Sequence, residues 1–235
     1  RQWRVFLFPT QKRKARLAES DSPRDYGAQS GREVLSEFIL VIDEGTTSTR
    51  AIAFDRELKP RGSAQAEIPL TFPKDGWVEQ DPEEIWSTTL NVCKAVIADC
   101  GGVDNFAAIG IANQRETTLV WDKKTGKTFG PAIIWQDRRT AAACQPLRDA
   151  GKEKEVQALS GLLLDPYFSA TKIRWILDTY PEAQKAADED RAAFGTVDSF
   201  LLSRLTSGRE HSTDVTNASR TALMDLAASS WSTHL

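Results

Sequence analysis

The chain has 235 residues, of which 40% are hydrophobic and 27% are charged, a composition typical of a globular protein with one large or two small domains. Its formal net charge of −3 argues against a nucleic-acid-binding surface over the whole protein, so we expect no nucleic-acid partner. No apolar run approaches the roughly 20 residues that a helix needs to cross a bilayer, and we expect no membrane span. Cys93, Cys100 and Cys144 lack the paired spacing of a metal site, which favours packing roles in a reducing compartment.

Residues 1–36 differ in composition from the rest of the chain. Residues 1–17 include six basic residues and no acidic one, and a stretch rich in Asp, Ser, Pro and Gly follows. We expect a disordered or leader-like extension, although a basic, acid-poor segment is also typical of an organelle-targeting presequence. The protein is therefore expected in the cytoplasm, or in association with mitochondria if this segment is a targeting signal.

A β-hairpin is predicted next, from apolar runs at 38–42 and 51–54 on either side of a polar turn. Gly45 allows a ligand to approach the backbone closely, the hydroxyls at 46–49 offer hydrogen-bond donors, and Arg50 adds a fixed positive charge. These groups suit phosphate oxygens, and Asp43 is placed to hold a hydrated Mg²⁺ against them. A plain surface hairpin, whose hydroxyl groups only satisfy the turn, fits this stretch equally well.

The elements that follow predict an α/β domain. Weak alternation at 62–70 indicates a third strand and hence an antiparallel meander. Asp81 and Pro82 indicate the N-cap and first residue of a helix that ends near residues 100–102. The small apolar run at 107–112 predicts a buried central strand, and another strand follows at 119–121.

The second half of the sequence is mostly helical by its pattern. Helices are predicted at 140–150, 152–159, 169–180 and 198–205, with Asp137 as an N-cap before the first of them. The Thr-rich segment 213–217 is interpreted as a structural loop. His211 and His234 are isolated in the sequence and are expected at the surface.

A dense polar cluster, residues 113–118, follows the predicted central strand. In open α/β sheets ligands bind at the carboxyl ends of the strands. Arg115 and Glu116 combine a donor fork with a carboxylate acceptor, as needed to hold vicinal hydroxyl groups, although a solvent-exposed salt bridge at a strand end is the alternative. The Gly-Lys pair at 126–127 lacks the earlier glycine of a P-loop and is interpreted as a hairpin turn.

Seven segments together resemble the FGGY carbohydrate kinases, and within that family the glycerol kinases, in their order and spacing. They are 43–50, 76–82, 113–117, 135–139, 165–172, 194–198 and 213–221. The resemblance implies a ribonuclease H-like, actin-like ATPase domain at 37–235, with a mixed sheet, an antiparallel three-strand meander and flanking helices. It also implies an enzyme that transfers a phosphoryl group from ATP, with Mg²⁺, to glycerol and gives sn-glycerol 3-phosphate.

The resemblance also implies two sets of site residues. The set facing the nucleotide phosphates is Asp43, which also neighbours the metal, with Thr46, Thr47, Ser48 and Arg50. The set holding glycerol is Arg115, Glu116, Trp135 and Tyr167. The carboxylate, guanidinium and phenol groups can bond to hydroxyls while the indole packs on the carbon chain. Without the resemblance, the last two residues of this set would be interpreted as core.

The sequence departs from the family pattern at Glu44, where a glutamine is usual. A charge there would repel phosphate unless the side chain points outward, which puts phosphate affinity in doubt. Thr49 in place of a serine, and Asp137 after 135–136, are expected to be neutral changes.

The sequence is expected to be the first lobe of a longer kinase. Its only methionine is Met224, it ends without a turn signal, and the family's catalytic carboxylate and adenine pocket lie beyond residue 235. We therefore expect the isolated chain to be inactive or severely impaired, and the full-length form to be a homo-oligomer. A lobe of another FGGY polyol or sugar kinase, and a non-catalytic binding protein with an actin-like fold, are the alternatives.

Overall fold

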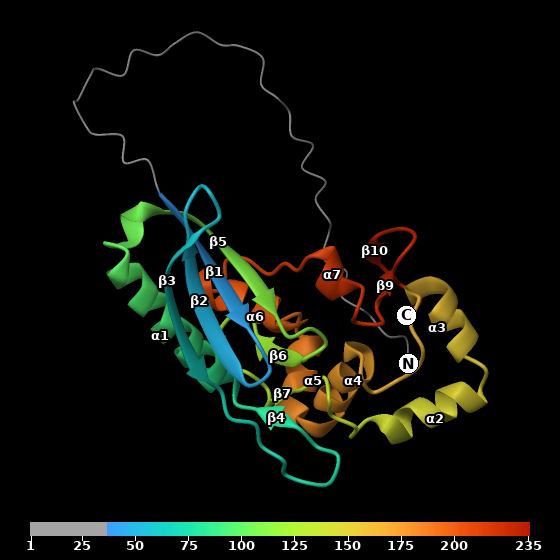
Figure 1. Ribbon diagram of the computed structural model, residues 1–235. Coiled ribbons are helices and arrows are strands. Elements are labelled where there is room, and N and C mark those ends of the chain that lie inside the picture. The colour runs from blue at the N-terminus through green and yellow to red at the C-terminus, as the bar shows by residue number, and fades with distance from the viewer. Residues whose placement is uncertain (1–36) are drawn as a thin grey trace.

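The computed structural model describes residues 37–235, so the predictions for residues 1–36 lie outside it. Its central feature is a four-stranded sheet with the order β3-β2-β1-β5 (Figure 1). The strands are β1 (Phe38–Glu44), β2 (Ser48–Phe54), β3 (Pro60–Glu67) and β5 (Phe106–Asn113). The first three pair antiparallel and β5 runs parallel to β1, which confirms the predicted meander within a mixed sheet.

One face of this sheet is covered by α1 (Pro82–Asp99) and α6 (Val197–Leu205), which both lie behind it in Figure 1. Alternate residues of β1, such as Leu40 and Ile42, are buried on this face because side chains alternate along a strand. The predicted start of α1 is confirmed, since the Asp81 carboxylate accepts a hydrogen bond from the Glu83 N–H at 2.8 Å. Burial of each such apolar side chain contributes roughly 1.5–3 kcal/mol to folding.

The helical part packs around a second core that includes Ile133, Ile176 and Ala183. A two-stranded ladder of β6 (Leu119–Asp122) and β8 (Ala192–Gly195) joins it to the first core, because Trp121 contacts Phe200 of α6. The remaining elements are β4 (Glu79–Gln80), η1 (Val103–Asn105), β7 (Ala132–Ile133), α2 (Ala141–Asp149), α3 (Glu153–Ser160), α4 (Ser169–Thr179), α5 (Pro181–Asp188), α7 (Val215–Ala218), β9 (Met224–Asp225) and β10 (Ser230–Trp231). Helices α2 and α3 extend to one side, and α3 lies beside β9 and β10 (Figure 1).

The prediction that 107–112 forms a buried central strand is wrong in its position and burial. The strand exists, but β5 is the edge strand of the described sheet and pairs only with β1 there. Ile109 is 50% exposed, and Ala107, Ala108 and Ala112 are exposed as well. A run of small apolar residues predicts a strand reliably, but it does not say how many neighbours the strand has.

Two smaller predictions also need correction. Asp137 is not an N-cap of α2, which begins four residues later; instead its carboxylate accepts hydrogen bonds from the N–H groups of Val78 and Arg139. His211 is not a plain surface residue, because its ring contacts Trp121 edge-on at 5.2 Å and bonds the Phe194 carbonyl at 2.8 Å. Burial lowers the pKa of His211, which favours the neutral ring.

The expected packing role of the cysteines agrees with the structure. The three cysteines are free thiols, and burial raises the pKa of Cys93 to about 11, as for a packing residue. Within 37–235, no helix is long and apolar enough to cross a membrane.

Candidate active site

The β1–β2 hairpin presents a row of polar side chains on the sheet face that α1 and α6 leave open. Asp43, Arg50 and Gln65 are paired neighbours across three adjacent strands, so their side chains project from the same face. Asp43 and Arg50 are both exposed. The turn between the strands needs Gly45, because a Cβ there would stand only 3.0 Å from the Ser48 carbonyl oxygen.

Gln65 holds two of the predicted phosphate residues in place. Its amide oxygen accepts from Arg50 Nε and Nη2 at 3.1 and 2.8 Å, and its amide nitrogen donates to Ser48 Oγ at 3.0 Å. An open pocket of about 440 Å³ lies beside the turn, lined in part by Thr47, Ser48 and Gln65. Sequence reasoning missed Gln65; the signal was its position opposite Arg50 in a predicted meander.

Behind the turn lies a buried network of amides and a carboxyl group. Gln114 Nε2 lies 3.2 Å from the Gly45 carbonyl oxygen, 2.9 Å from Gln80 Oε1 and 3.3 Å from Glu44 Oε1. Gln80 in turn donates to the Thr46 carbonyl at 2.8 Å. The conformation of the turn is therefore fixed by two glutamines from β4 and from the end of β5.

Glu44 points into this network, on the opposite face of β1 from Asp43, and is fully buried. Burial raises the pKa of Glu44 to about 8, the charge of Asp43 adds to this, and the bond from Gln114 opposes it. The carboxyl group is thus mostly protonated at pH 7. The side chain is turned inward and mostly neutral, so it places little charge on the face of the hairpin that carries Asp43 and Arg50.

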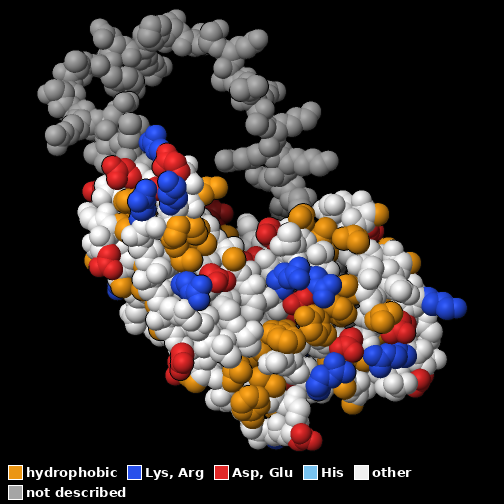
Figure 2. All heavy atoms as spheres, viewed as in Figure 1, with side chains coloured by type: hydrophobic (Ala, Val, Ile, Leu, Met, Phe, Trp, Pro, Cys, Tyr) orange, Lys and Arg blue, Asp and Glu red, His pale blue; other side chains and the backbone are white. Residues whose placement is uncertain are grey.

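A second group of residues forms a wall next to the hairpin. Trp135 donates its indole N–H to Thr46 Oγ1 at 3.0 Å, which ties this wall to the turn. The Trp135 and Tyr167 rings meet edge-on with centroids 5.7 Å apart, and both are only half-buried rather than part of a core. Figure 2 shows hydrophobic, basic and acidic side chains next to one another in the region between the sheet and the helical part.

Glu116 completes this wall in an unusual backbone conformation. Its φ of 64° lies in the left-handed region, and its side chain is buried. Its carboxylate pairs with Arg220, whose guanidinium also lies 5.7 Å from the centre of the Tyr167 ring. Arg115, predicted to act beside Glu116, is exposed and forms no hydrogen bond or ion pair with the rest of 37–235.

Arg220 was not among the predicted site residues. It belongs to the segment 213–221 that carried part of the resemblance, but 213–217 was interpreted as a structural loop. The segment is structural, since Asp214 caps α7 by accepting from the Asn217 N–H, but it is not wholly a loop, because Val215–Ala218 form this short helix. The side chain that pairs with Glu116 lies three residues beyond that segment.

The residues present fit a hydrated magnesium ion only in combination with phosphate. No group of three or more metal-ligating side chains occurs within the described part of the chain. Asp43 offers one exposed carboxylate, and Mg²⁺ is commonly bound by one or two carboxylates, several waters and substrate phosphates. Asp43 next to the hairpin meets that requirement.

Residues 38–235 match the N-terminal domain of the FGGY family of carbohydrate kinases. The chain belongs to this family. The actin-like, mixed α/β fold of residues 37–235 agrees with this assignment, and so do the segments that carried the resemblance in the sequence.

Several known FGGY kinases are similar to this chain. It is 55% identical over 202 residues to the glycerol kinase of Marinomonas sp. and 56% identical over 202 residues to glycerol kinase 1 of Pseudomonas aeruginosa. Each match covers 86% of this chain but only 41% of the relative. The crystal structure of Plasmodium falciparum glycerol kinase with ADP superposes with a TM-score of 0.78 at 36% identity, over 83% of this chain and 39% of that one.

Proposed function

We propose that residues 37–235 form the first lobe of a glycerol kinase, in which the full-length protein transfers the terminal phosphoryl group of ATP to a glycerol hydroxyl. The observation that carries the proposal is the bond between Trp135 and Thr46, which joins a polyol wall to a phosphate hairpin at 3.0 Å. A kinase needs its acceptor and its phosphate donor held side by side, since phosphoryl transfer depends mostly on positioning and charge stabilisation.

The hairpin would hold the phosphates. Thr46, Thr47 and Ser48 offer hydroxyl and backbone donors, while Arg50, fixed by Gln65, offers a planar fork of N–H groups. A magnesium ion held by Asp43 would neutralise charge on the phosphate oxygens. The neutral, inward-facing Glu44 leaves this electrostatic arrangement undisturbed.

The wall would hold glycerol. Trp135 and Tyr167 supply an aromatic corner for the carbon chain. The buried Glu116 supplies an acceptor for hydroxyl groups, and the half-buried Arg220 supplies a donor. Arg115 would reach the polyol from its exposed position at the end of β5. A site that pairs each hydroxyl discriminates strongly against analogues that leave a buried polar group unpaired.

The relatives named glycerol kinase support this substrate, and the share of their length that the chain covers supports a second lobe for the remaining parts. We propose that the adenine pocket and the carboxylate that takes the hydroxyl proton belong to that second lobe. Homo-oligomerisation of the full-length protein and the assignment of residues 1–36 as an extension remain predictions.

The test is calorimetric titration of residues 37–235 with a panel of polyols. Glycerol should bind more tightly than ribitol, xylulose and gluconate, and the isolated chain should form little glycerol 3-phosphate with MgATP. A different order of affinities would point to another FGGY kinase, and binding of none would favour a non-catalytic protein. Turnover close to that of a full-length relative would show that the lobe is complete by itself.

A further inference from the structure

Lys172 is fully buried in the first turn of α4, behind the polyol wall. Its ammonium nitrogen Nζ donates to two main-chain carbonyls, that of Glu116 at 3.1 Å and that of Tyr167 at 2.9 Å. Lysine is almost never fully buried unless its nitrogen is paired. Here the two partners are the backbones of two residues of the proposed glycerol site, whose side chains both contact Arg220.

The first partner needs such support because Glu116 has a left-handed backbone. For a residue with a side chain of this size, that conformation costs roughly 1–2 kcal/mol and persists only when neighbouring groups hold it. The Glu116 carbonyl accepts from Lys172 Nζ and also from Thr118 Oγ1 at 2.9 Å. These bonds fix the direction in which the Glu116 carboxylate leaves the backbone.

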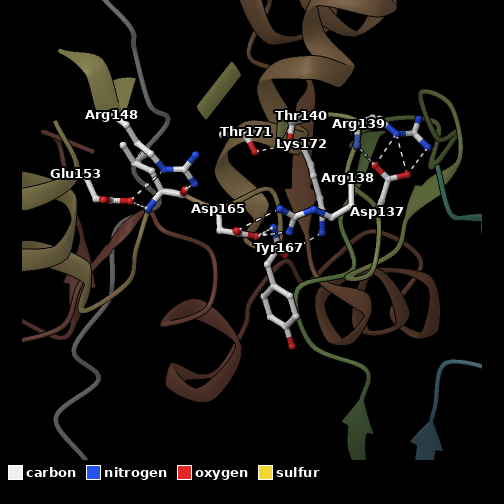
Figure 3. Close-up of polar contacts among 11 residues, drawn as sticks. Asp137, Arg138, Arg139, Thr140, Arg148, Glu153, Asp165, Tyr167, Thr171 and Lys172 are labelled. Carbon is white, nitrogen blue, oxygen red and sulfur yellow. Dashed lines mark hydrogen bonds and ion pairs between the residues drawn. The ribbon is translucent and has the colours of Figure 1, made fainter. Parts of the chain in front are cut away.

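The second partner, Tyr167, is held on both sides of its backbone. Asp165 accepts from the Tyr167 N–H at 2.9 Å and is itself paired with Arg138 at 2.7 Å, while Lys172 binds the Tyr167 carbonyl. In Figure 3 the Tyr167 ring points away from this polar cluster. The ring is therefore free to meet Trp135, while its backbone is anchored through Lys172 to Glu116 on another element.

We propose that Lys172 is a positioning residue that sets the spacing between Glu116 and Tyr167 in the proposed glycerol site. The inference rests on the proposed function for the identity of the ligand, but the positioning itself is a property of the backbone contacts. Without Lys172, no hydrogen-bond donor would link the main chains of Glu116 and Tyr167, and only the contacts of Arg220 with their side chains would still connect them.

The two bonds do not require a charged lysine. Burial lowers the pKa of Lys172 to about 7; Asp137, Glu116 and Asp165 favour its charge, and Arg139 opposes it. A neutral amine still has two N–H groups, enough for both carbonyls. The spacing of the pocket should therefore persist on both sides of neutral pH.

The test compares Lys172→Met, which keeps an unbranched apolar side chain but removes the nitrogen and its donors, with the matched control Lys185→Met on the exposed face of α5. The Lys185 side chain is 73% exposed. Two readouts are measured on the full chain: glycerol affinity by calorimetry, and the ¹⁹F spectrum after labelling with 3-fluorotyrosine. The chain contains only three tyrosines, so the signal of Tyr167 can be assigned with Tyr167→Phe.

We expect Lys172→Met to weaken glycerol binding about 10- to 100-fold, as for a misplaced pocket, and to shift or broaden the Tyr167 signal. The Tyr180 signal should be unchanged and should report that the domain is folded, and Lys185→Met should alter neither readout. If Lys172→Met does not fold, Lys172→Gln takes its place, because its amide is one bond shorter and cannot stand at the Nζ position.

Unchanged affinity together with an unchanged Tyr167 signal in a folded variant would overturn the inference. If the unmodified chain prefers another polyol, the glycerol proposal fails and the same comparison is made with that polyol. If it binds none, the proposed function fails while the Tyr167 signal still decides the role of Lys172.

Discussion

Replacing Glu44 with glutamine should change how the stability of the domain depends on pH. The folded carboxyl group keeps its proton up to a pKa of about 8, whereas the ordinary value is 4.5. Between these two values the folded state binds one more proton than the unfolded state. The stabilising contribution is therefore fully present below about pH 4.5 and is lost as the pH rises toward 8.

The expected change in the free energy of unfolding follows from the same two pKa values of Glu44. Each pH unit in this window corresponds to about 1.4 kcal/mol for one proton, so the free energy of unfolding should fall by about 2–3 kcal/mol between pH 5 and pH 7. Glu44→Gln cannot titrate, so this component of the slope should be absent from it. The slope is compared rather than the difference in stability between the two proteins at pH 5. That difference also includes the change at the second carboxyl oxygen of Glu44, which has no partner among the described residues.

Urea unfolding of the chain at several pH values between 5 and 8, in metal-free buffer with a chelator, measures both slopes. Glu210→Gln, a change at an exposed site, should follow the unmodified chain at every pH. Parallel slopes for the unmodified chain and Glu44→Gln would refute the reasoning, because they would mean that the folded carboxyl group loses its proton at an ordinary pKa.

Three further substitutions test the packing and the site. Ile176→Ala should cost about 2–5 kcal/mol in urea unfolding, because Ile176 is fully buried in the second core, whereas Leu163→Ala, at a site 52% exposed, should cost far less. Arg139→Met should cost about 3–5 kcal/mol, since it leaves the carboxylates of Asp137 and Glu79 without their buried partner; a loss below 1 kcal/mol would contradict this. Trp135→Phe keeps an aromatic ring but removes the donor to Thr46, so in the full-length protein it should weaken glycerol and nucleotide binding together, whereas Trp86→Phe should affect neither.

The local elements of the fold could be predicted because local signals decide them. Asp81 and Pro82 specify where α1 begins, and β-branched runs around Gly45 specify the hairpin. Burial of β5 was predicted wrongly because a run of small residues fits either a central or an edge strand. Helix α5 was not predicted, although Pro181 occupies its first position directly after the predicted helix at 169–180.

The contacts that join distant segments could not be predicted from local pattern. Gln80 lies in β4, Gln114 follows β5 and Glu44 ends β1. Only the tertiary fold brings these three side chains within hydrogen-bond distance. The same holds for Lys172, whose position in an amphipathic helix gives no sign that it reaches residue 116. The family resemblance indicated which residues would contact ligands, but it did not indicate which other residues hold these contact residues in position.

These supporting contacts connect the two halves of the site. Thr46 accepts a bond from Trp135 at its side chain and from Gln80 at its carbonyl, so the turn that would hold phosphate moves with the wall that would hold glycerol. Gln114 extends this connection to the end of β5, two residues before the strained Glu116. Because Glu44 lies within the same network and is neutral, a glutamate can replace the usual glutamine there without placing a charge beside the phosphates, at the cost of a stability that depends on pH.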